Sequence, residues 1–220
     1  DRDYCDEVLR RLENAFAWYL RAMNDILGTA TDIPDEAQLD TVIEIATTAL
    51  RNWGIHDAEL EIVKHRENTV FKATARGGRC YALRVHQAGL HDDNAIRSEL
   101  AWMQALHADG FLGPAVVPAE NGDAVVTVCV GNETRRCSLL EWIEGGLFND
   151  LGRVENGMRE EMCGRYRQLG ALAARLHIQA TAWQPPPDFQ RHNWDEDGLL
   201  GDEPRMGRFW DHPDLTTKQR

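Results

Sequence analysis

Residues 67–86 decide the fold, with the sequence ENTVFKATARGGRCYALRVH. Two runs rich in β-forming residues flank the pair Gly77-Gly78. A glycine pair between such runs supplies the positive φ angles that a two-residue hairpin turn needs. We therefore expect two antiparallel strands here, with one cation, Arg84, inside the second strand.

The hairpin extends into a larger sheet. From Ala58 onward the hydrophobic period is close to two, which is typical of half-buried strands. Further short strands are predicted at 60–63, 116–117, 124–130 and 137–142, and helical spacing predicts a helix over 94–108. The result is an α+β fold in which a five-stranded antiparallel sheet carries one helix after its third strand.

Helical spacing also marks both sides of this region. Helices are predicted at 3–27 and 39–53, ending at Gly28 and Gly54, and a longer one at 158–183 with an apolar stripe. The tail after residue 184 is predicted to be an irregular loop followed by a helix start at 214–220. We divide the chain into an N-terminal helical extension (1–57), the sheet domain (58–143) and the beginning of a helical domain (144–220).

Composition narrows the function. The 220 residues carry 36 acidic and 24 basic side chains, a net charge of -12 that argues against binding nucleic acid by phosphate neutralisation. No apolar run approaches the roughly 18 residues of a membrane span, and no signal peptide is visible. The five cysteines are odd in number and form no C-x-x-C pair, which favours reduced thiols and a cytoplasmic setting. The chain starts at Asp1 rather than Met, so we expect a fragment.

A strand cation and a helix carboxylate form the pattern most relevant to chemistry. Arg84 lies in the third strand, and Glu99 lies in the helix that follows. A cation on that strand with a carboxylate on the next helix is the layout of a kinase small lobe. The alternative is that Arg84 is an ordinary arginine on a solvent-facing strand surface, because alternation places it beside Ala82, opposite Leu83.

Four segments in order resemble the aminoglycoside phosphotransferase (APH)/choline kinase-like family, near type II homoserine kinases and the bacterial stress-response kinase. They are ENTVFKATARGGRCYALRVH, AIRSELAWMQAL, LLEWIEGG and RQLGALAARLH, and the resemblance covers roughly residues 58–220. It implies a protein-kinase-like small lobe and the start of a helical large lobe. It also implies that Arg84 grips the nucleotide phosphates, that Glu99 orients it, and that Ala82 packs on adenine. Arginine in place of the usual lysine departs from kinases in general.

The same resemblance assigns the remaining nucleotide contacts. Asn68 falls at the turn between the first two strands, where kinases cover the phosphates, although a plain turn residue is an equal alternative. The segment Leu140–Gly145 resembles the hinge between the lobes, where the Glu141 carbonyl and the Ile143 amide would bind adenine. The alternative for this segment is a strand that ends in a glycine turn.

Two further clusters imitate functional motifs. His212-Pro213-Asp214 has the H-x-D form of a kinase catalytic loop, but Gln219 stands where that loop needs a metal-binding Asn. It is better interpreted as a helix start capped by Asp214. The segment HNWDEDG at 192–198 suggests a metal, but no ligand spacing supports this, and a solvated acidic loop is the better interpretation.

We therefore expect an ATP-dependent phosphotransferase that acts on a hydroxyl of a small molecule or a protein. No catalytic residue is predicted within the chain, because the H-G-D-x-x-x-x-N loop and the later metal-binding Asp of the family are expected beyond Arg220. ATP and Mg²⁺ are the implied cofactors, and the fragment alone is expected to be inactive. Nucleic acid and membranes are not expected partners. The alternatives are a catalytically silent nucleotide-binding pseudokinase or a non-enzymatic interaction scaffold.

Overall fold

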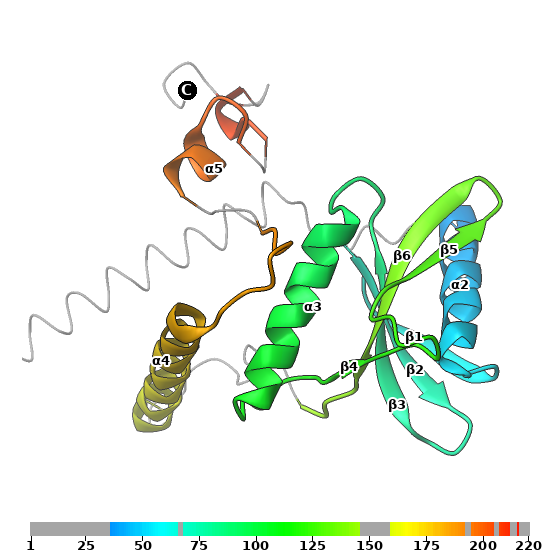
Figure 1. Ribbon diagram of the computed structural model, residues 1–220, viewed down its shortest axis with the longest axis horizontal. Helices are drawn as coiled ribbons and strands as arrows, with labels where there is room; N and C mark the ends of the chain where they lie inside the picture. The colour runs from blue at the N-terminus through cyan, green and yellow to red at the C-terminus, as the bar shows by residue number, and fades with distance from the viewer. Residues whose placement is uncertain are drawn as a thin grey trace, which may run out of the picture. The chain divides into compact units, whose positions relative to one another are not determined.

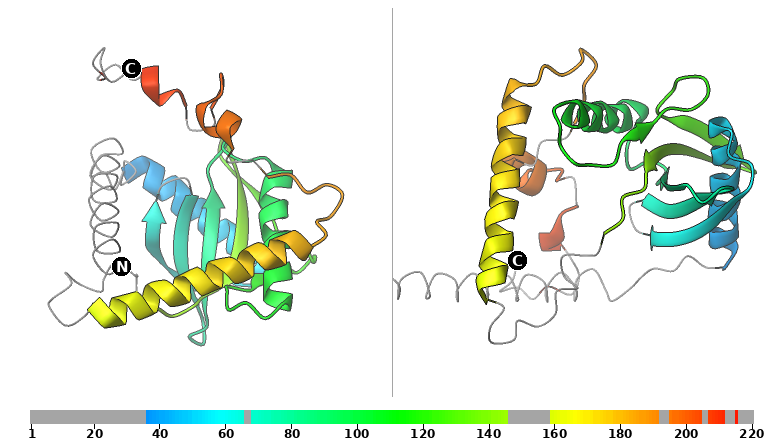
Figure 2. Two further views of the ribbon diagram at one scale, coloured as in Figure 1. Left: turned by 90° about the vertical axis from the view of Figure 1, so that its left-hand side faces the viewer. Right: turned by 90° about the horizontal axis from the view of Figure 1, so that it is seen from below.

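The computed structural model describes residues 36–65, 68–145, 159–191, 195–204, 207–211 and 215. Within these ranges the fold is α+β, with an antiparallel sheet and helices, as the sequence predicts (Figure 1, Figure 2). The helix predicted at 3–27 lies outside the described residues, as does the helix start at 214–220 apart from Leu215.

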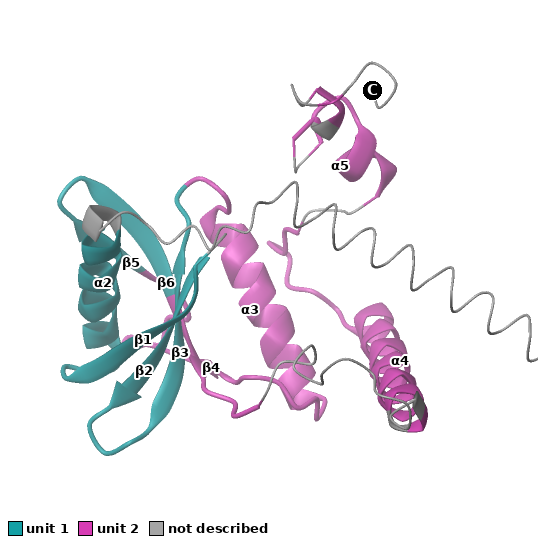
Figure 3. Cartoon of the chain, turned by 180° about the vertical axis from the view of Figure 1, so that it is seen from behind, with its two compact units in different colours: residues 1–88, 127–137 teal, residues 89–126, 138–220 magenta. Residues whose placement is uncertain are grey.

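The chain forms two compact units, which we describe separately (Figure 3). Unit 1 contains the chain up to Ala88 together with Thr127–Cys137. Unit 2 contains Gly89–Val126 and the chain from Ser138 onward.

In unit 1 the helix predicted at 39–53 is present, but it begins three residues earlier and its last three residues form a 3-10 turn. Helix α2 spans Glu36–Leu50, and a 3-10 turn, η1, continues it over Arg51–Trp53. Gly54 ends the turn in the left-handed conformation, with φ of 67°, where a residue without Cβ is favoured. The predicted stop at Gly54 is therefore confirmed.

The strands of the sheet are β1 (Ala58–His65), β2 (Asn68–Ala75), β3 (Cys80–His86), β4 (Val116–Val117), β5 (Val126–Val130) and β6 (Glu133–Glu141). Their order is β1-β2-β3-β6-β4, and β5 pairs with β6. Within the described residues this makes six strands rather than the five expected. Each of the six overlaps a segment predicted to be a strand, the short run at 116–117 included, where Val116 and Val117 pair with Leu140 and Leu139.

The hairpin between β2 and β3 has a longer turn than predicted. The main chain of Ala75 donates to Arg79 at 2.8 Å, and Gly78 donates back to Ala75 at 2.9 Å. Three residues, Arg76 to Gly78, therefore lie between Ala75 and Arg79, the hydrogen-bonded residues that close the loop, instead of two. Gly77 and Gly78 both have positive φ, at 105° and 86°, so the conformational reason for the glycine pair is confirmed.

The two faces of the hairpin differ in burial. Phe71 pairs with Leu83 across the strands, and both are fully buried, as is Ala73. Helix α2 packs against this part of the sheet and contributes its own buried stripe (Figure 2): Val42, Ile45, Ala46, Ala49 and Leu50. The apolar stripe of α2 removes the apolar face of the hairpin from water, which is the main source of stability for such a pair of layers.

Unit 2 contains three helices and a 3-10 turn within the described residues. They are α3 (Asp93–Ala108), α4 (Arg159–Ala182), α5 (Glu196–Leu200) and η3 (Phe209–Asp211). The side chain of Asp92 caps α3 by accepting from the Ala95 amide at 2.7 Å. Helices α3 and α4 match the predictions within a residue or two. The tail was expected to be irregular, but α5 and η3 interrupt it.

The predicted apolar stripe of α4 is only partly covered. Leu169 and Leu172 are 50 and 43% exposed, whereas Ala173 and Leu176 are half-buried. Among the described helices, none combines the length and the apolar character that crossing a membrane requires.

Candidate functional site

Three of the predicted nucleotide-binding residues share one face of the hairpin in unit 1. Asn68 is the first residue of β2 and pairs with His86. Arg84 pairs with Val70, and Ala82 pairs with Lys72. Residues directly opposite in an antiparallel ladder point to the same side, and alternate residues along a strand do too. The register therefore places Asn68, Ala82 and Arg84 together, opposite the face that α2 covers.

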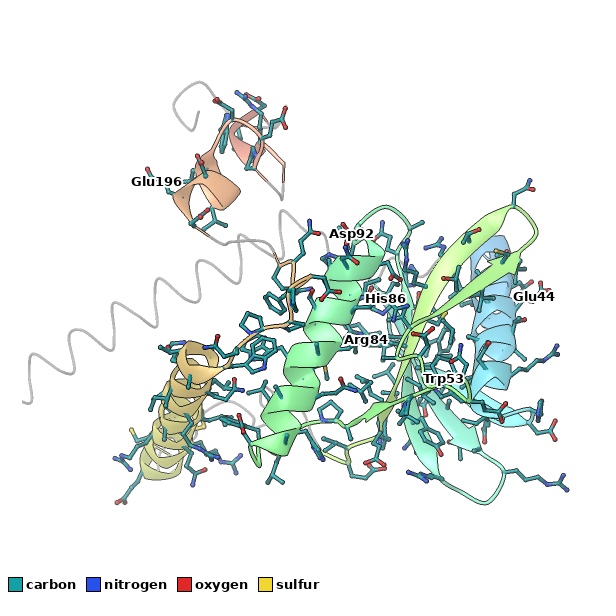
Figure 4. The ribbon with its side chains drawn as sticks, in the orientation of Figure 1. Glu44, Trp53, Arg84, His86, Asp92 and Glu196 are labelled. Atoms are coloured by element: carbon teal, nitrogen blue, oxygen red, sulfur yellow. The ribbon has the colours of Figure 1, made fainter. Side chains whose placement is uncertain are left out.

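The character of this face suits a polar ligand. Arg84 and Ala82 are half-buried, in contrast to the fully buried Leu83 between them. Figure 4 shows Arg84 on the side of the sheet that faces away from α2. At this position the strand fixes the stem of the arginine, and a planar guanidinium can bind phosphate with two parallel hydrogen bonds.

Lys72 is a cation on this face that sequence reasoning missed. It lies between Glu61 of β1 and Ala82 of β3 in the ladder, and it is half-buried. The signal was present in the alternation of β2, because Asn68, Val70 and Lys72 occupy even positions. It was overlooked because the family resemblance directs attention to a single cation on β3.

The other three predicted residues lie in unit 2. Glu99 projects from α3, and its Oε2 accepts from Arg191 Nη1 at 3.2 Å. Both side chains of this ion pair are partly covered, at 25% exposure for Glu99 and 35% for Arg191. No local pattern connects two residues 92 positions apart, so sequence reasoning missed the Arg191 contact.

The hinge-like segment leaves the sheet where β6 ends. Glu141 is the last residue of β6, and its amide donates to the Ala115 carbonyl at 2.8 Å. Residues 142–145 then run without regular structure, and the indole of Trp142 donates to Glu144 at 2.9 Å. Ile143 is 53% exposed. Backbone N–H and C=O groups in an irregular segment are not committed to a sheet by their strand position, so an adenine base could hydrogen-bond to such groups.

The structure describes part of the segment 192–198 and none of the segment 212–214. Asp195 caps α5 by accepting from the Gly198 amide at 2.9 Å, so the cap explains this carboxylate without a metal. In the described part of the chain, no group of three His, Cys, Asp or Glu side chains could hold a metal ion. His192 and the segment 212–214 lie outside the described residues.

Comparison with known proteins bears on the family and the fold of the chain. The sequence model of the phosphotransferase enzyme family, APH, matches residues 59–217. No curated protein matches the chain in sequence. Among solved structures, a microcompartment-associated aminopropanol kinase is 32% identical with a TM-score of 0.64, and the match covers 76% of this chain and 49% of that one.

A second solved structure shares the fold at lower identity. It is the amicoumacin kinase hAmiN in complex with AMP-PNP, Ca²⁺ and Ami, 19% identical with a TM-score of 0.56, covering 76% of this chain and 47% of the other. The chain thus spans about half the length of the two kinases it matches. Family match, identity and fold coincide over the sheet and the helices that follow it, and the chain belongs to the APH phosphotransferase enzyme family.

Proposed function

We propose that this protein is an ATP-dependent phosphotransferase that moves the γ-phosphate of ATP to a hydroxyl group of a small molecule or a protein. Membership of the APH family supports the reaction class. The single observation that carries the proposal to this chain is the half-buried hairpin face with Asn68, Ala82 and Arg84, which lies opposite the face covered by α2.

On this proposal Arg84 is the phosphate-binding residue. Its strand position and half-burial reduce the freedom of its stem, so less entropy is lost when it binds an anion. Ala82, one step along the same face, is small enough to leave room for a flat base. Asn68, at the start of β2, adds a side-chain amide at the turn end of the same face.

Glu99 and the hinge complete the proposed roles. A carboxylate that pairs with a phosphate-binding cation fixes the direction of that cation, and we assign this role to Glu99 toward Arg84. The Glu141 carbonyl and the Ile143 amide are the proposed hydrogen-bond partners of adenine. Because these are main-chain groups, the proposed role does not depend on the side chains of Glu141 and Ile143. The 53% exposure of Ile143 is therefore compatible with it.

Mg²⁺ is part of the proposal, but the described residues do not fit it, because they hold no cluster of carboxylates for a divalent ion. When bound, the ion would neutralise charge on the β- and γ-phosphates. The family resemblance implies that the metal ligands and the catalytic Asp belong to an H-G-D-x-x-x-x-N loop and a later Asp. No step of the reaction is assigned to a residue of this chain beyond nucleotide binding and orientation.

An amino alcohol is the first acceptor to test. The solved kinase that is 32% identical to this chain is described as an aminopropanol kinase. A short alcohol that carries an ammonium group also suits a protein with a net charge of -12, since opposite charge favours encounter.

The test is ATP consumption by a form of the protein that includes the family's H-G-D-x-x-x-x-N loop, with an aminopropanol and neutral alcohols as acceptors. Arg84→Ala should lower kcat/KM about 100-fold, the usual effect of losing one charge-stabilising donor. Arg84→Lys should retain part of the rate. Arg79→Ala is the matched control, because Arg79 belongs to the hairpin turn and lies 5.2 Å over the Tyr81 ring.

Three outcomes separate the alternatives. Transfer to an alcohol that depends on Arg84 supports the proposal. ATP binding without transfer to any acceptor would favour a silent nucleotide-binding module. A rate that falls equally in Arg84→Ala and Arg79→Ala would remove Arg84 from the site.

A further inference from the structure

In unit 2, one face of α3 is covered by the last residues of α4 and by the segment that follows α4. Ala95, Ser98, Glu99 and Trp102 recur at the spacings i, i+3, i+4 and i+7, so they line one side of the helix. Each of these four residues contacts a group between Gln179 and Arg191. We call residues 183–191 the strap.

The strap begins at an aromatic anchor. Trp102 of α3 stacks on Trp183 with ring centroids 6.4 Å apart, and Phe189 meets Trp183 edge-on at 5.2 Å. The Trp102 indole also donates to Gln179 Oε1 at 3.0 Å, while Gln179 Nε2 donates to Asp109 at 2.9 Å. Gln179 is buried, at 8% exposure, and both ends of its amide are satisfied. The anchor therefore fixes the end of α4 against α3.

The strap itself is stiff and turns back along α3. Pro185, Pro186 and Pro187 each have a restricted φ, and the Phe189 amide closes a turn onto the Pro186 carbonyl at 2.9 Å. Few conformations are available to such a segment before it docks, so little entropy is lost on docking. The turn delivers the next two residues of the chain to the first half of α3.

Those two residues make the contacts closest to Glu99. The Gln190 amide donates to Ser98 Oγ at 2.8 Å, and Ser98 is buried, at 3% exposure. Arg191 Nη1 donates both to the Ala95 carbonyl at 3.2 Å and to Glu99 Oε2 at 3.2 Å. The guanidinium is therefore held by the helix backbone while it holds one carboxylate oxygen of Glu99.

We propose that Arg191 is a positioning residue for Glu99. By holding Oε2, the strap removes rotamer freedom from a long side chain and fixes the direction of its carboxylate. This inference rests on the proposed function, in which Glu99 orients the phosphate-binding Arg84. It adds to that function a residue from the chain beyond the sheet domain, 92 positions from Glu99.

The experiment is a double-mutant cycle on ATP affinity, measured by calorimetry with the 220-residue chain. Arg191→Ala should weaken ATP binding about fivefold, which corresponds to roughly 1 kcal/mol, because only the positioning of Glu99 is lost and not a contact with ATP itself. In the Glu99→Gln background the same substitution should change the affinity less than about twofold, because the group that it positions has lost its charge. Arg191→Lys keeps the charge but loses the planar guanidinium with its several donors. Its ATP affinity should lie between those of the wild type and Arg191→Ala.

Arg167→Ala is the matched control, since Arg167 is an exposed arginine of α4 and its loss should leave ATP affinity unchanged.

Equal effects of Arg191→Ala in the wild-type and Glu99→Gln backgrounds would overturn the inference, because a merely structural contact acts independently of the charge on Glu99. Tighter ATP binding by Arg191→Ala would also overturn it, since Arg191 would then compete for Glu99. If the wild-type chain binds no ATP, the proposed function fails first; if it binds ATP through Arg84 and Arg191→Ala has no effect, only this inference fails.

Discussion

Burial changes the acidity of one thiol, that of Cys137 in β6. Cys137 has no exposed surface, and burial raises the pKa of its thiol from an ordinary value of 9.0 to about 12, with Arg135 acting weakly in the opposite direction. The folded state therefore keeps the proton at a pH where the unfolded chain has lost it. The contribution of this group to stability is complete below pH 9 and is lost as pH rises toward 12.

The corresponding measurement is urea unfolding between about pH 8 and about pH 11, a window that spans the ordinary thiol pKa. The free energy of unfolding should fall by up to about 1.4 kcal/mol per pH unit above roughly pH 9 because of this thiol. Cys137→Ala should be less stable at all pH values but should lack this part of the slope. Cys129→Ser is the control, because Cys129 is exposed. Identical pH slopes for wild type and Cys137→Ala would contradict the assignment.

At the scale of residues, sequence reasoning succeeds where the period of one strand decides the answer. Alternation alone placed Ala82 and Arg84 on one face, and the register of β2 and β3 agrees. It failed for Arg191, whose contact with Glu99 depends on where the strap docks and not on any local pattern. The roles of the six predicted nucleotide-binding residues stay predictions.

At the scale of elements, the hairpin turn offers a clean test of backbone conformation. Gly77 has φ of 105°, and a Cβ added there would meet no atom within 4 Å. Gly77→Ala should therefore destabilise unit 1 only through the left-handed backbone, by about 1–2 kcal/mol. Gly170→Ala is the matched comparison, because Gly170 lies inside α4 with open space around it, and alanine should stabilise that helix by about 0.8–1 kcal/mol. A neutral or stabilising Gly77→Ala in thermal unfolding would contradict the turn described here.

The hairpin and the sheet also show what element patterns leave undecided. The Gly-Gly pair predicted a turn with positive φ, but it could not tell which flanking residues make the last pair, so the loop has three residues instead of two. The strand predicted at 116–117 is confirmed, but its sequence does not tell that β6 is the strand it pairs with. Both the loop length and the strand partner depend on pairing between segments, which periodicity within one segment does not contain.

At the scale of the whole molecule, α2 belongs to the core of unit 1. Ile45, Ala46 and Ala49 have no exposed surface, and the hairpin face that they help to cover includes Phe71 and Leu83. Removing residues 1–57 should expose that face and leave the remaining chain unfolded or aggregated. Even Ile45→Ala should lower the free energy of unfolding by about 2–5 kcal/mol. Ile43→Ala, at a position that is 36% exposed on the same helix, should have a much smaller effect.

A truncated chain, residues 58–220, with a far-ultraviolet circular dichroism spectrum and a melting temperature equal to those of the whole chain would contradict this role for α2. The sequence predicted the helix itself and its end at Gly54, because both depend on local spacing. It could not predict that the helix covers the sheet, because the local pattern of one segment does not tell which distant segment packs against it.

The measurement that tests the central claim most directly is a calorimetric titration of the 220-residue chain with ATP and Mg²⁺, beside Arg84→Ala and Arg79→Ala. The proposed hairpin site predicts saturable binding of one ATP per chain, weak because the chain spans about half the length of the kinases it matches. Arg84→Ala should weaken that binding at least about tenfold, the equivalent of about 1.4 kcal/mol, and Arg79→Ala should not change it. Absence of binding by the wild-type chain, or equal binding by Arg84→Ala, would contradict the account.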